Sequence, residues 1–529
     1  MLSILILCAV VIFFAIFTNK FIRGLGIPSL LFFMALGMLF GSDGLFKIDY
    51  ENYAITKEMC SIALGFIIFY GGFCTKWETA KPIIAKASIL STVGVLLTAT
   101  FTCIFCHYIL NVEFLESFLI GAVISSTDAA SVFSILKSKN LNLKDSTAPL
   151  LEIESGSNDP MSYILVILAI TLLQGQSVNF VMILFLKQML FGILTGLVIA
   201  KFASFIFTKT KLITAGNDTL FVIGIVLAAY AFPELYSGNP FLSVYFLGFI
   251  LGNSKIKNKS ALVNFFDSIT SLAQIGIFFI LGLLAFPSKI PSLLMTGSLI
   301  FLFITFIARP LTIFLLMTPF KASFGQNLLV SWAGLRGVAS IVFAIIAIDS
   351  GINLHYDLFH LVFLISILSV AFQGTILPYF AQKVNMIDEF SDVRKTFNDY
   401  QEDFSIKLLN VEITEKSDWV DKEIKDIKLQ QGSLILNIHR GNERIVPKGN
   451  TKILLGDSVI VSLPNTNVGD DITLKEIIID KKHKWCNKKI KDLTLPNNYL
   501  IVMIKRDGET IVPNGEITLL EDDLLAIYD

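Results

Sequence analysis

Two neighbouring stretches of the chain carry acidic and hydroxyl side chains within otherwise apolar sequence. The first, ISSTDAASVF, places three hydroxyls directly before Asp128. The second, LLEIESGSNDP, contains Glu154, Ser155, Asn158 and Asp159. A charge near the bilayer centre costs at least about 2.5–3.5 kcal/mol, so acids there face a cavity, a partner or an ion path. Carboxylates in that position can hold a cation or a proton.

Helical spacing divides the second stretch into two neighbouring faces. Ser155 and Asp159 are four residues apart, and so are Glu154 and Asn158. Residues with this spacing are neighbours on a helix surface. We therefore expect Ser155 and Asp159 to face the ion, and Glu154 and Asn158 to face an adjacent helix. Pro160 has no N–H and disfavours regular helix before it, which should loosen the backbone at Asp159.

The hydroxyls before Asp128 have two possible roles. As small side chains they could simply pack at a helix–helix contact. Beside a carboxylate they could instead satisfy a broken helix that lines a cavity, where irregular backbone is tolerated at membrane depth. The attached Asp128 favours the second role. Hydroxyls, free carbonyls and carboxylates together make an all-oxygen site suited to a hard monovalent ion.

Glu154 requires a buried cation as a partner, because an unpaired buried charge is too costly to leave alone. The preferred candidate is Arg336, in SWAGLRG, where Gly334 and Gly337 permit close approach of another helix. The alternative is Arg309, in FITFIARPLTIF. The sequence favours Arg336, since Arg309 could lie nearer the cytoplasmic interface.

The surrounding chain has the composition of a membrane protein. Hydrophobic residues make up 54% of it and charged residues 16%, whereas about 25% of a soluble domain is charged. The net charge of −1 gives no support for nucleic acid as a partner. Thirteen apolar stretches approach the roughly 20 residues that cross a bilayer. They begin near Leu2, Pro28, Met59, Lys86, Phe114, Ala148, Phe180, Thr219, Phe241, Ser268, Ser292, Asn327 and Leu358.

Basic residues in the loops predict the orientation. Taken alternately, one set of loops holds fifteen lysines and arginines and the other set holds three. Because basic loops remain in the cytoplasm, the N-terminus is predicted to lie outside. An odd number of helices then places the C-terminal tail in the cytoplasm. No basic residue precedes the first apolar stretch, which we expect to be a retained helix of a cell-membrane protein rather than a cleaved signal peptide.

The last 130 or so residues contain an internal duplication. Residues 419–461 align without gaps onto 485–527, and seventeen of the 43 positions are identical. Each copy is predicted to be a small α/β unit of a strand, a short helix, a two-stranded hairpin and a last strand. We predict a transmembrane domain at 1–385, a linker at 386–403, and two units at 404–465 and 470–529. The units either complete each other's core or sense a ligand, and spacing alone favours the former.

These motifs carry a family resemblance. SSTDAASVF, LLEIESGSNDP and SWAGLRG, in this order, resemble the monovalent cation:proton antiporters of the NhaP and sodium–proton exchanger branch. The resemblance covers roughly residues 1–385. SSTDAA with ESGSNDPMSY is most similar to the bacterial potassium/proton antiporters of that branch. The tail resembles two copies of the C-terminal regulator-of-potassium-conductance unit of the TrkA-C type.

The resemblance implies an all-α polytopic membrane fold of about 13 helices, followed by an α+β tail. It also implies inverted repeats, a dimerisation domain, a mobile core domain and a homodimer. Two broken helices are expected to cross at the ion site. One would hold Thr127 and Asp128, and the other would lie near Gly374, in AFQGTILPYF.

The resemblance further implies roles for single residues. Asp159 would bind cation and proton alternately, and the coordination would be completed by Asp128, Thr127 and Ser155. Glu154 and Arg336 would form a structural ion pair. Asn158, where another branch has an acid, is associated with electroneutral exchange. Tyr70, in FIIFYGGF, stands where relatives often have an acid, which puts a contribution from that helix in doubt.

Exchange of K⁺ or Na⁺ for H⁺ is the function that these features predict, with K⁺ favoured by the resemblance. A gated cation channel is the competing class, but no TVGYG-like filter is present. Motifs of a membrane enzyme are also missing, as HExxH and GxSxG do not occur. No cofactor and no metal beyond the transported cation is expected. The tail could bind cyclic di-AMP, a cation or no ligand at all.

Overall fold

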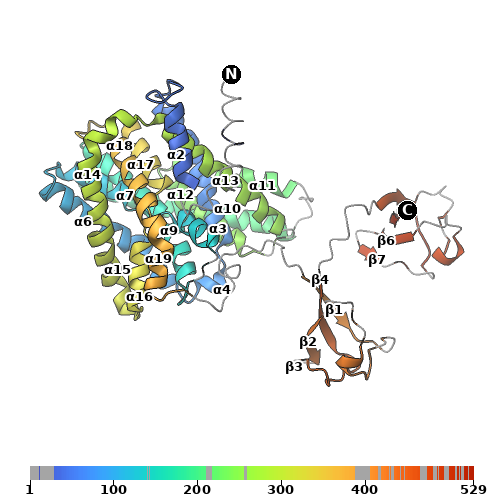
Figure 1. The fold of residues 1–529 in the computed structure, drawn as a ribbon. Helices are drawn as coiled ribbons and strands as arrows, with labels where there is room; N and C mark the ends of the chain where they lie inside the picture. Colours follow the sequence, from blue (N-terminus) through green and yellow to red (C-terminus); the bar gives the residue numbers. More distant parts are fainter. Residues whose placement is uncertain are drawn as a thin grey trace. The chain divides into compact units, whose positions relative to one another are not determined.

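The computed structural model describes Val11, Phe13, most of residues 29–387, and most of residues 406–528. In the first part it omits 140, 142, 210–216, 255, 257 and 258. In the second part its longer gaps are 430–433, 465–473, 480–484 and 494–499. Two compact units divide the chain, Met1–Gln401 and Glu402–Asp529. Each is described by itself (Figure 1).

Among the described residues, the first unit is built of helices joined by loops, with one isolated β-bridge between Leu143 and Ile387. Its helices are α2 (Ser29–Phe40), α3 (Tyr53–Cys74), α4 (Trp77–Ala80), α5 (Ile84–Ile89), α6 (Val95–Tyr108), α7 (Phe114–Ile124), α8 (Ala129–Ser138), α9 (Thr147–Leu173), α10 (Val178–Lys209), α11 (Asn217–Glu234), α12 (Pro240–Gly252), α13 (Lys259–Leu284), α14 (Ile290–Phe303), α15 (Arg309–Met317), α16 (Phe324–Trp332), α17 (Val338–Asp349), α18 (Leu358–Leu368) and α19 (Thr375–Lys383). Short 3₁₀ turns, η2 (Pro287–Lys289) and η4 (Thr318–Phe320), flank α14 and α15.

Several of these helices are long and apolar enough to cross a membrane. Among the described residues, seven continuous spans are long and apolar enough, and four shorter apolar helices accompany them. The protein is therefore a multi-pass membrane protein. The predicted first helix falls almost wholly outside the described residues, so the count of thirteen stays a prediction.

Three of the spans are continuous through a π-helical stretch. These stretches are η1 (Leu90–Gly94), η3 (Ile304–Ala308) and η5 (Ser369–Gly374). Two of them precede a proline, Pro310 or Pro378, whose ring clashes with the carbonyl four residues earlier. The carbonyls displaced in this way belong to Phe306 and Gly374, both inside a π stretch. Such stretches insert one residue without ending the helix.

Two helices are broken in the middle. The first break, residues 125–128, separates α7 from α8, as the sequence predicted. The second, residues 333–337, separates α16 from α17. The prediction of a second break near Gly374 is wrong, because Pro378 produces the π stretch η5 there and the helix continues into α19. The true break instead contains Gly334 and Gly337.

One group of helices packs through glycines. Helix α12 packs on α3, α13 packs on α2 and α3, and α10 and α11 pack on α12. A Cβ at Gly248 would lie 2.2 Å from the carbonyl oxygen of Phe69, and one at Gly282 would lie 2.3 Å from that of Met34. Larger side chains at these positions would force the helices apart. We call this group (α2, α3 and α10–α13) the scaffold.

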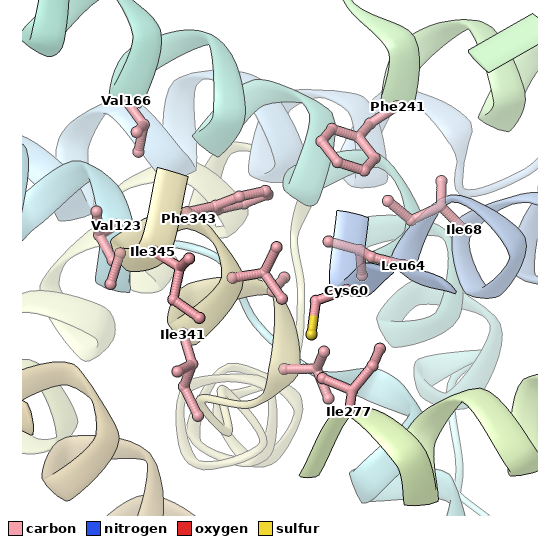
Figure 2. Close-up of a cluster of buried hydrophobic side chains, with 14 of the residues drawn as sticks. Cys60, Leu64, Ile68, Val123, Val166, Phe241, Ile277, Ile341, Phe343 and Ile345 are labelled. Atoms are coloured by element: carbon pink, nitrogen blue, oxygen red, sulfur yellow. The ribbon is translucent and has the colours of Figure 1, made fainter. Parts of the chain in front are cut away.

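The remaining helices carry both breaks, and we call them the core. They contact the scaffold through α9, which packs against α3, α10 and α12, and through α17, which packs against α3. Figure 2 shows the apolar cluster at this contact, with Cys60, Leu64 and Ile68 of α3 near Ile341, Phe343 and Ile345 of α17. The two groups thus meet through buried apolar side chains at this cluster.

The second unit contains two four-stranded antiparallel sheets with the same strand order. The first runs β1-β4-β2-β3 and the second runs β5-β8-β6-β7. Their strands are β1 (Ile406–Glu412), β2 (Leu434–Arg440), β3 (Glu443–Ile445), β4 (Ser458–Pro464), β5 (Leu474–Ile478), β6 (Leu500–Arg506), β7 (Glu509–Ile511) and β8 (Leu524–Tyr528). A 3₁₀ turn, η6 (Ile424–Asp426) or η7 (Ile490–Asp492), stands where each short helix was predicted.

Each sheet contains an equivalent buried ion pair. Arg440 donates to both carboxylate oxygens of Asp457, at 2.9 Å each, and Arg506 does so to Asp523, at 2.7 Å each. Both aspartates are fully buried, with 1% and 0% exposed. This equivalence confirms the duplication predicted from the sequence.

Candidate ion-binding site

The two helix breaks contact each other through their backbones. The N–H of Asp128, in the first break, donates to the carbonyl oxygen of Leu335, in the second, at 2.8 Å. Arg336 Nη1 donates to the carbonyl oxygens of Ser125 and Ser126, at 2.9 and 2.7 Å. The carbonyls left without helical partners at one break are thus satisfied by the other. The two breaks therefore cross. The first lies at the predicted position, and the second lies at Leu335 and Arg336 instead of near Gly374.

Helix α9 presents its polar side chains to the first break. The Ser126 hydroxyl donates to Asp159 Oδ1. The Ser155 hydroxyl donates to the carbonyl oxygen of Thr127 at 2.5 Å, and Asn158 Nδ2 donates to the hydroxyl oxygen of Thr127 at 2.5 Å. Both neighbouring faces of α9 therefore meet the same break. The spacing of Asn158 had suggested that it faces an adjacent helix, but Asn158 contacts the first break instead.

Asp128 lies beside Asp159 but is anchored to its own helix. Its carboxylate accepts from the N–H and the hydroxyl of Ser131, at 3.2 and 2.6 Å. It belongs to the same break as Ser126, which donates to Asp159. The second break approaches from the other side, where a Cβ at Gly337 would lie 2.1 Å from Asp128 Oδ2. Only glycine fits at that contact.

The structure corrects the predicted ion pair. Arg309, at the start of α15, donates to Glu154 at 2.5 Å, and both side chains are buried, with 2% and 1% exposed. Arg336 is engaged by the carbonyls of the first break. Gly334 makes the Arg309 pairing possible, since a Cβ there would lie 2.9 Å from Arg309 Nε. The glycine that suggested Arg336 as the partner makes room for the alternative candidate instead.

The stretch near Gly374 supports the second break. The Ser369 hydroxyl accepts from the N–H of Arg336 at 3.0 Å and donates to Gln373 Oε1 at 2.6 Å. Gln373 Nε2 donates to the carbonyl oxygen of Trp332 at 3.3 Å. The sequence did not predict the roles of Ser369 and Gln373, nor the contact of Ser126 with Asp159. Polar residues within an apolar π stretch are the signal that could have found the first two.

One oxygen at the site is left over. Asn158 Oδ1 is buried and has no hydrogen-bond partner among the described residues. Asp159 has 9% of its surface exposed and Asn158 none. With the carboxylates of Asp128 and Asp159 and the Thr127 hydroxyl, the described site offers oxygen ligands alone. Such a set suits a hard monovalent cation, and a carboxylate in it can take a proton instead.

Tyr70 lies on the scaffold and is paired there. Its hydroxyl donates to Asp267 Oδ1, on α13, at 3.1 Å. A carboxylate from the neighbouring helix therefore lies next to the position where the family resemblance leads one to expect an acid. The hydrogen bond of Tyr70 thus lies within the scaffold.

Comparisons with known proteins agree with this arrangement. The family described as "Sodium/hydrogen exchanger, transmembrane" matches residues 9–383, and the TrkA-C domain matches 408–469 and 474–528. A K(+)/H(+) antiporter NhaP of Alkalimonas amylolytica is 33% identical over 85% of this chain and 79% of its own. A K(+)/H(+) antiporter NhaP2 of Shewanella oneidensis is 32% identical over 83% of this chain and 77% of its own.

A solved structure shares the fold. The sodium proton antiporter MjNhaP1 of Methanocaldococcus jannaschii covers 72% of this chain and 99% of its own, with a TM-score of 0.64 and 23% identity. The crossing breaks, the oxygen site and the matches over most of both units lead to one conclusion. The chain belongs to the transmembrane sodium/hydrogen exchanger family and carries a tail of two TrkA-C domains.

Proposed function

We propose that the protein exchanges a monovalent cation for H⁺ across the cell membrane by alternating access. The observation that carries this proposal is the position of Asp159, which lies against a broken helix among oxygen ligands. If this carboxylate must hold either a cation or a proton before the core can move, exchange is obligatory. Glu154 does not take part, because Arg309 neutralises it.

In this mechanism each site residue has a defined task. Asp159 is the alternating carrier. Asp128, Thr127, Ser155 and Asn158 complete the shell around the cation. Access alternates as the core moves against the scaffold around this midplane site. One cation for one proton moves no net charge, so we infer electroneutral exchange.

We propose K⁺ as the preferred cation. The relatives described above are named K(+)/H(+) antiporters and match most of the chain, including part of the tail. Exchange of Na⁺ is the second candidate, favoured by the name of the family and by the structural relative from Methanocaldococcus jannaschii. The oxygen ligands suit both ions, which differ in the cavity size they need.

The setting of this transporter is also a proposal. We infer an outside N-terminus, a cytoplasmic tail that regulates exchange, and a homodimer formed through the scaffold. The domain bounds 1–385, 404–465 and 470–529 stay predictions, as does the linker at 386–403. The tail's ligand is a cation, cyclic di-AMP or none.

The test is cation-driven proton movement in everted vesicles, measured by fluorescence quenching with K⁺ and then with Na⁺. Asp159→Asn should insert normally and abolish the signal for both ions. Glu58→Gln, which neutralises an exposed carboxylate on α3, is the matched control and should retain it. Wild-type exchange by Asp159→Asn would refute the assignment. Flux that does not saturate with cation and does not depend on pH would indicate a channel.

A further inference from the structure

The residues that follow the last membrane helix are bound to a loop of the core. Lys144 N–H donates to the carbonyl oxygen of Met386 at 2.9 Å, and Lys144 Nζ donates to that of Asn385 at 3.1 Å. Leu143 and Ile387 form an antiparallel β-bridge. We call residues 384–387, together with the described residues of 141–146, the clasp.

The clasp is anchored by burial as well as by hydrogen bonds. Met386 is only 3% exposed and Leu143 only 5%. Both belong to an apolar cluster that includes Leu136 of α8 and Leu150 and Ile153 of α9. The segment after α19 therefore inserts between the helices on both sides of the loop. It is an integral part of the core packing.

The N-terminus of α16 joins the same structure. A Cβ at Gly325 would lie 2.8 Å from the carbonyl oxygen of Val384. Gln326 Nε2 donates to the carbonyl oxygen of Asp145 at 3.0 Å and to the Thr147 hydroxyl at 3.1 Å. The clasp thus holds the ends of three helices, α8, α9 and α16, at one place.

Each of these helices leads directly to the ion site. From the clasp, α8 runs back to Asp128 at the first break. Helix α9 starts at Thr147 and carries Asp159 three turns later, and α16 runs to the second break at Ala333. A shift of the clasp would therefore move all three elements that form the site. Packed helices transmit such shifts because their interfaces are not continuously deformable.

Along the chain, the clasp is the last described part of the membrane unit before the tail. The tail unit, Glu402–Asp529, is joined to the helices through residues 384–387. We propose that the clasp is the coupling element through which the tail sets the rate of exchange. A pull or a relaxation at residues 384–387 changes the packing of Met386 and the loop at 141–146, and through them the two breaks. This inference rests on the proposed exchange function.

A reversible crosslink tests the proposal. Leu143→Cys with Ile387→Cys places two cysteines across a β-bridge, where Cα atoms lie about 4.5–5.5 Å apart, a distance that suits a disulfide. Exchange is compared for the full chain and for a chain ended after residue 403, in wild type and in the double-cysteine variant, with Cys486→Ser in the full-length chains to remove a competing thiol of the tail.

The expected result is a dependence on the crosslink. In wild type, and in the reduced variant, removing the tail should change the rate of exchange or the half-saturating cation concentration by about fivefold or more, as common coupling factors do. In the oxidised variant the ratio should fall to about one, and reduction should restore it. An equal ratio in the oxidised and reduced forms would overturn the proposal, and so would a wild-type chain unaffected by tail removal.

A second variant and a second readout separate this inference from the proposed function. Met386→Ala with Lys144→Met loosens the clasp without touching the ion site, and should also bring the ratio to about one. Amide hydrogen exchange of residues 141–153 should change on tail removal in wild type but not in the oxidised variant. That readout requires no transport, so a protein without exchange but with this protection pattern would fail the proposed function alone. Unchanged protection at 141–153 in wild type would overturn the clasp.

Discussion

Glu154→Gln should restore part of the free energy of unfolding that is lost in Arg309→Met. In the Arg336→Met background, the same substitution should lower the free energy of unfolding further. Arg309 and Glu154 are paired and buried. Arg309→Met leaves a buried carboxylate unpaired, which costs about 3–5 kcal/mol. Neutralising Glu154 in that background removes the charge and leaves an amide, whose unsatisfied groups cost about 1–3 kcal/mol. The double variant should therefore recover roughly 2 kcal/mol, the difference between these two costs.

The sign is opposite for Arg336. Arg336→Met removes a donor from the carbonyls of Ser125 and Ser126, and hydrogen bonds to charged groups contribute about 1.5–3 kcal/mol each. Adding Glu154→Gln to this variant also breaks the pair with Arg309 and leaves that guanidinium buried without its carboxylate. The second substitution should thus add to the loss.

The assay is a double-mutant cycle on the purified protein in mixed micelles. The free energy of unfolding is taken from detergent-induced denaturation at pH 7, followed by the amount of protein that remains monodisperse. Glu58→Gln is again the control, because its carboxylate is exposed. If Glu154→Gln rescued Arg336→Met and failed to rescue Arg309→Met, the pairing drawn from the structure would be wrong and the pairing drawn from the sequence would be right.

Two further predictions concern the second break and the tail. Gly337→Ala should abolish exchange while the protein still inserts, because its Cβ would lie 2.1 Å from the Asp128 carboxylate. Gly276→Ala is the control, since a Cβ there meets nothing within 4 Å. Equal exchange signals from vesicles with either variant would contradict the role of Gly337. The hydrogen bond from Arg440 holds the pKa of Asp457 below its ordinary value. Because the pKa of Asp457 is lower in the folded chain than in the unfolded chain, its carboxylate stabilises the fold at pH values above the unfolded pKa of about 3.9. This stabilisation is lost as the pH falls through the folded pKa. Hydrogen exchange of β2 and β4 in the full chain, corrected for intrinsic rates, should therefore accelerate on acidification below about pH 4. Asp457→Asn should flatten this pH dependence, and an unchanged slope in the variant would contradict it.

Most residues of the candidate site could be singled out from the sequence because the signal was chemical. Acids and hydroxyls in apolar stretches have few structural roles, and the structure places Thr127, Asp128, Ser155, Asn158 and Asp159 within one cluster of contacts. The organisation of the tail could be predicted for a different reason. Its two copies repeat the same pattern of strands and turns, so each copy supported the interpretation of the other.

The corrections share a physical cause. Whether a polar, glycine-containing stretch breaks a helix or forms a π stretch depends on where the displaced carbonyls find donors, and these donors come from distant residues. The break near Gly374 was therefore predicted one span too late. The choice between Arg309 and Arg336 depended likewise on which guanidinium reaches Glu154 of α9. Periodicity along one segment contains no information about that contact.

The crossing of the breaks also arranges the electric dipoles of four half-helices. Helices α7 and α16 end there with partial negative charge, and α8 and α17 begin there with partial positive charge. Arg336 contacts the carbonyls beyond the end of α7, and Asp128 accepts from the N–H of Ser131 in the first turn of α8. These two fixed charges are thus each matched by a dipole of opposite sign. Asp159 lies inside a continuous helix and has no helix end of its own. Under the proposed function, its charge is therefore the one that the transported cation or proton would balance.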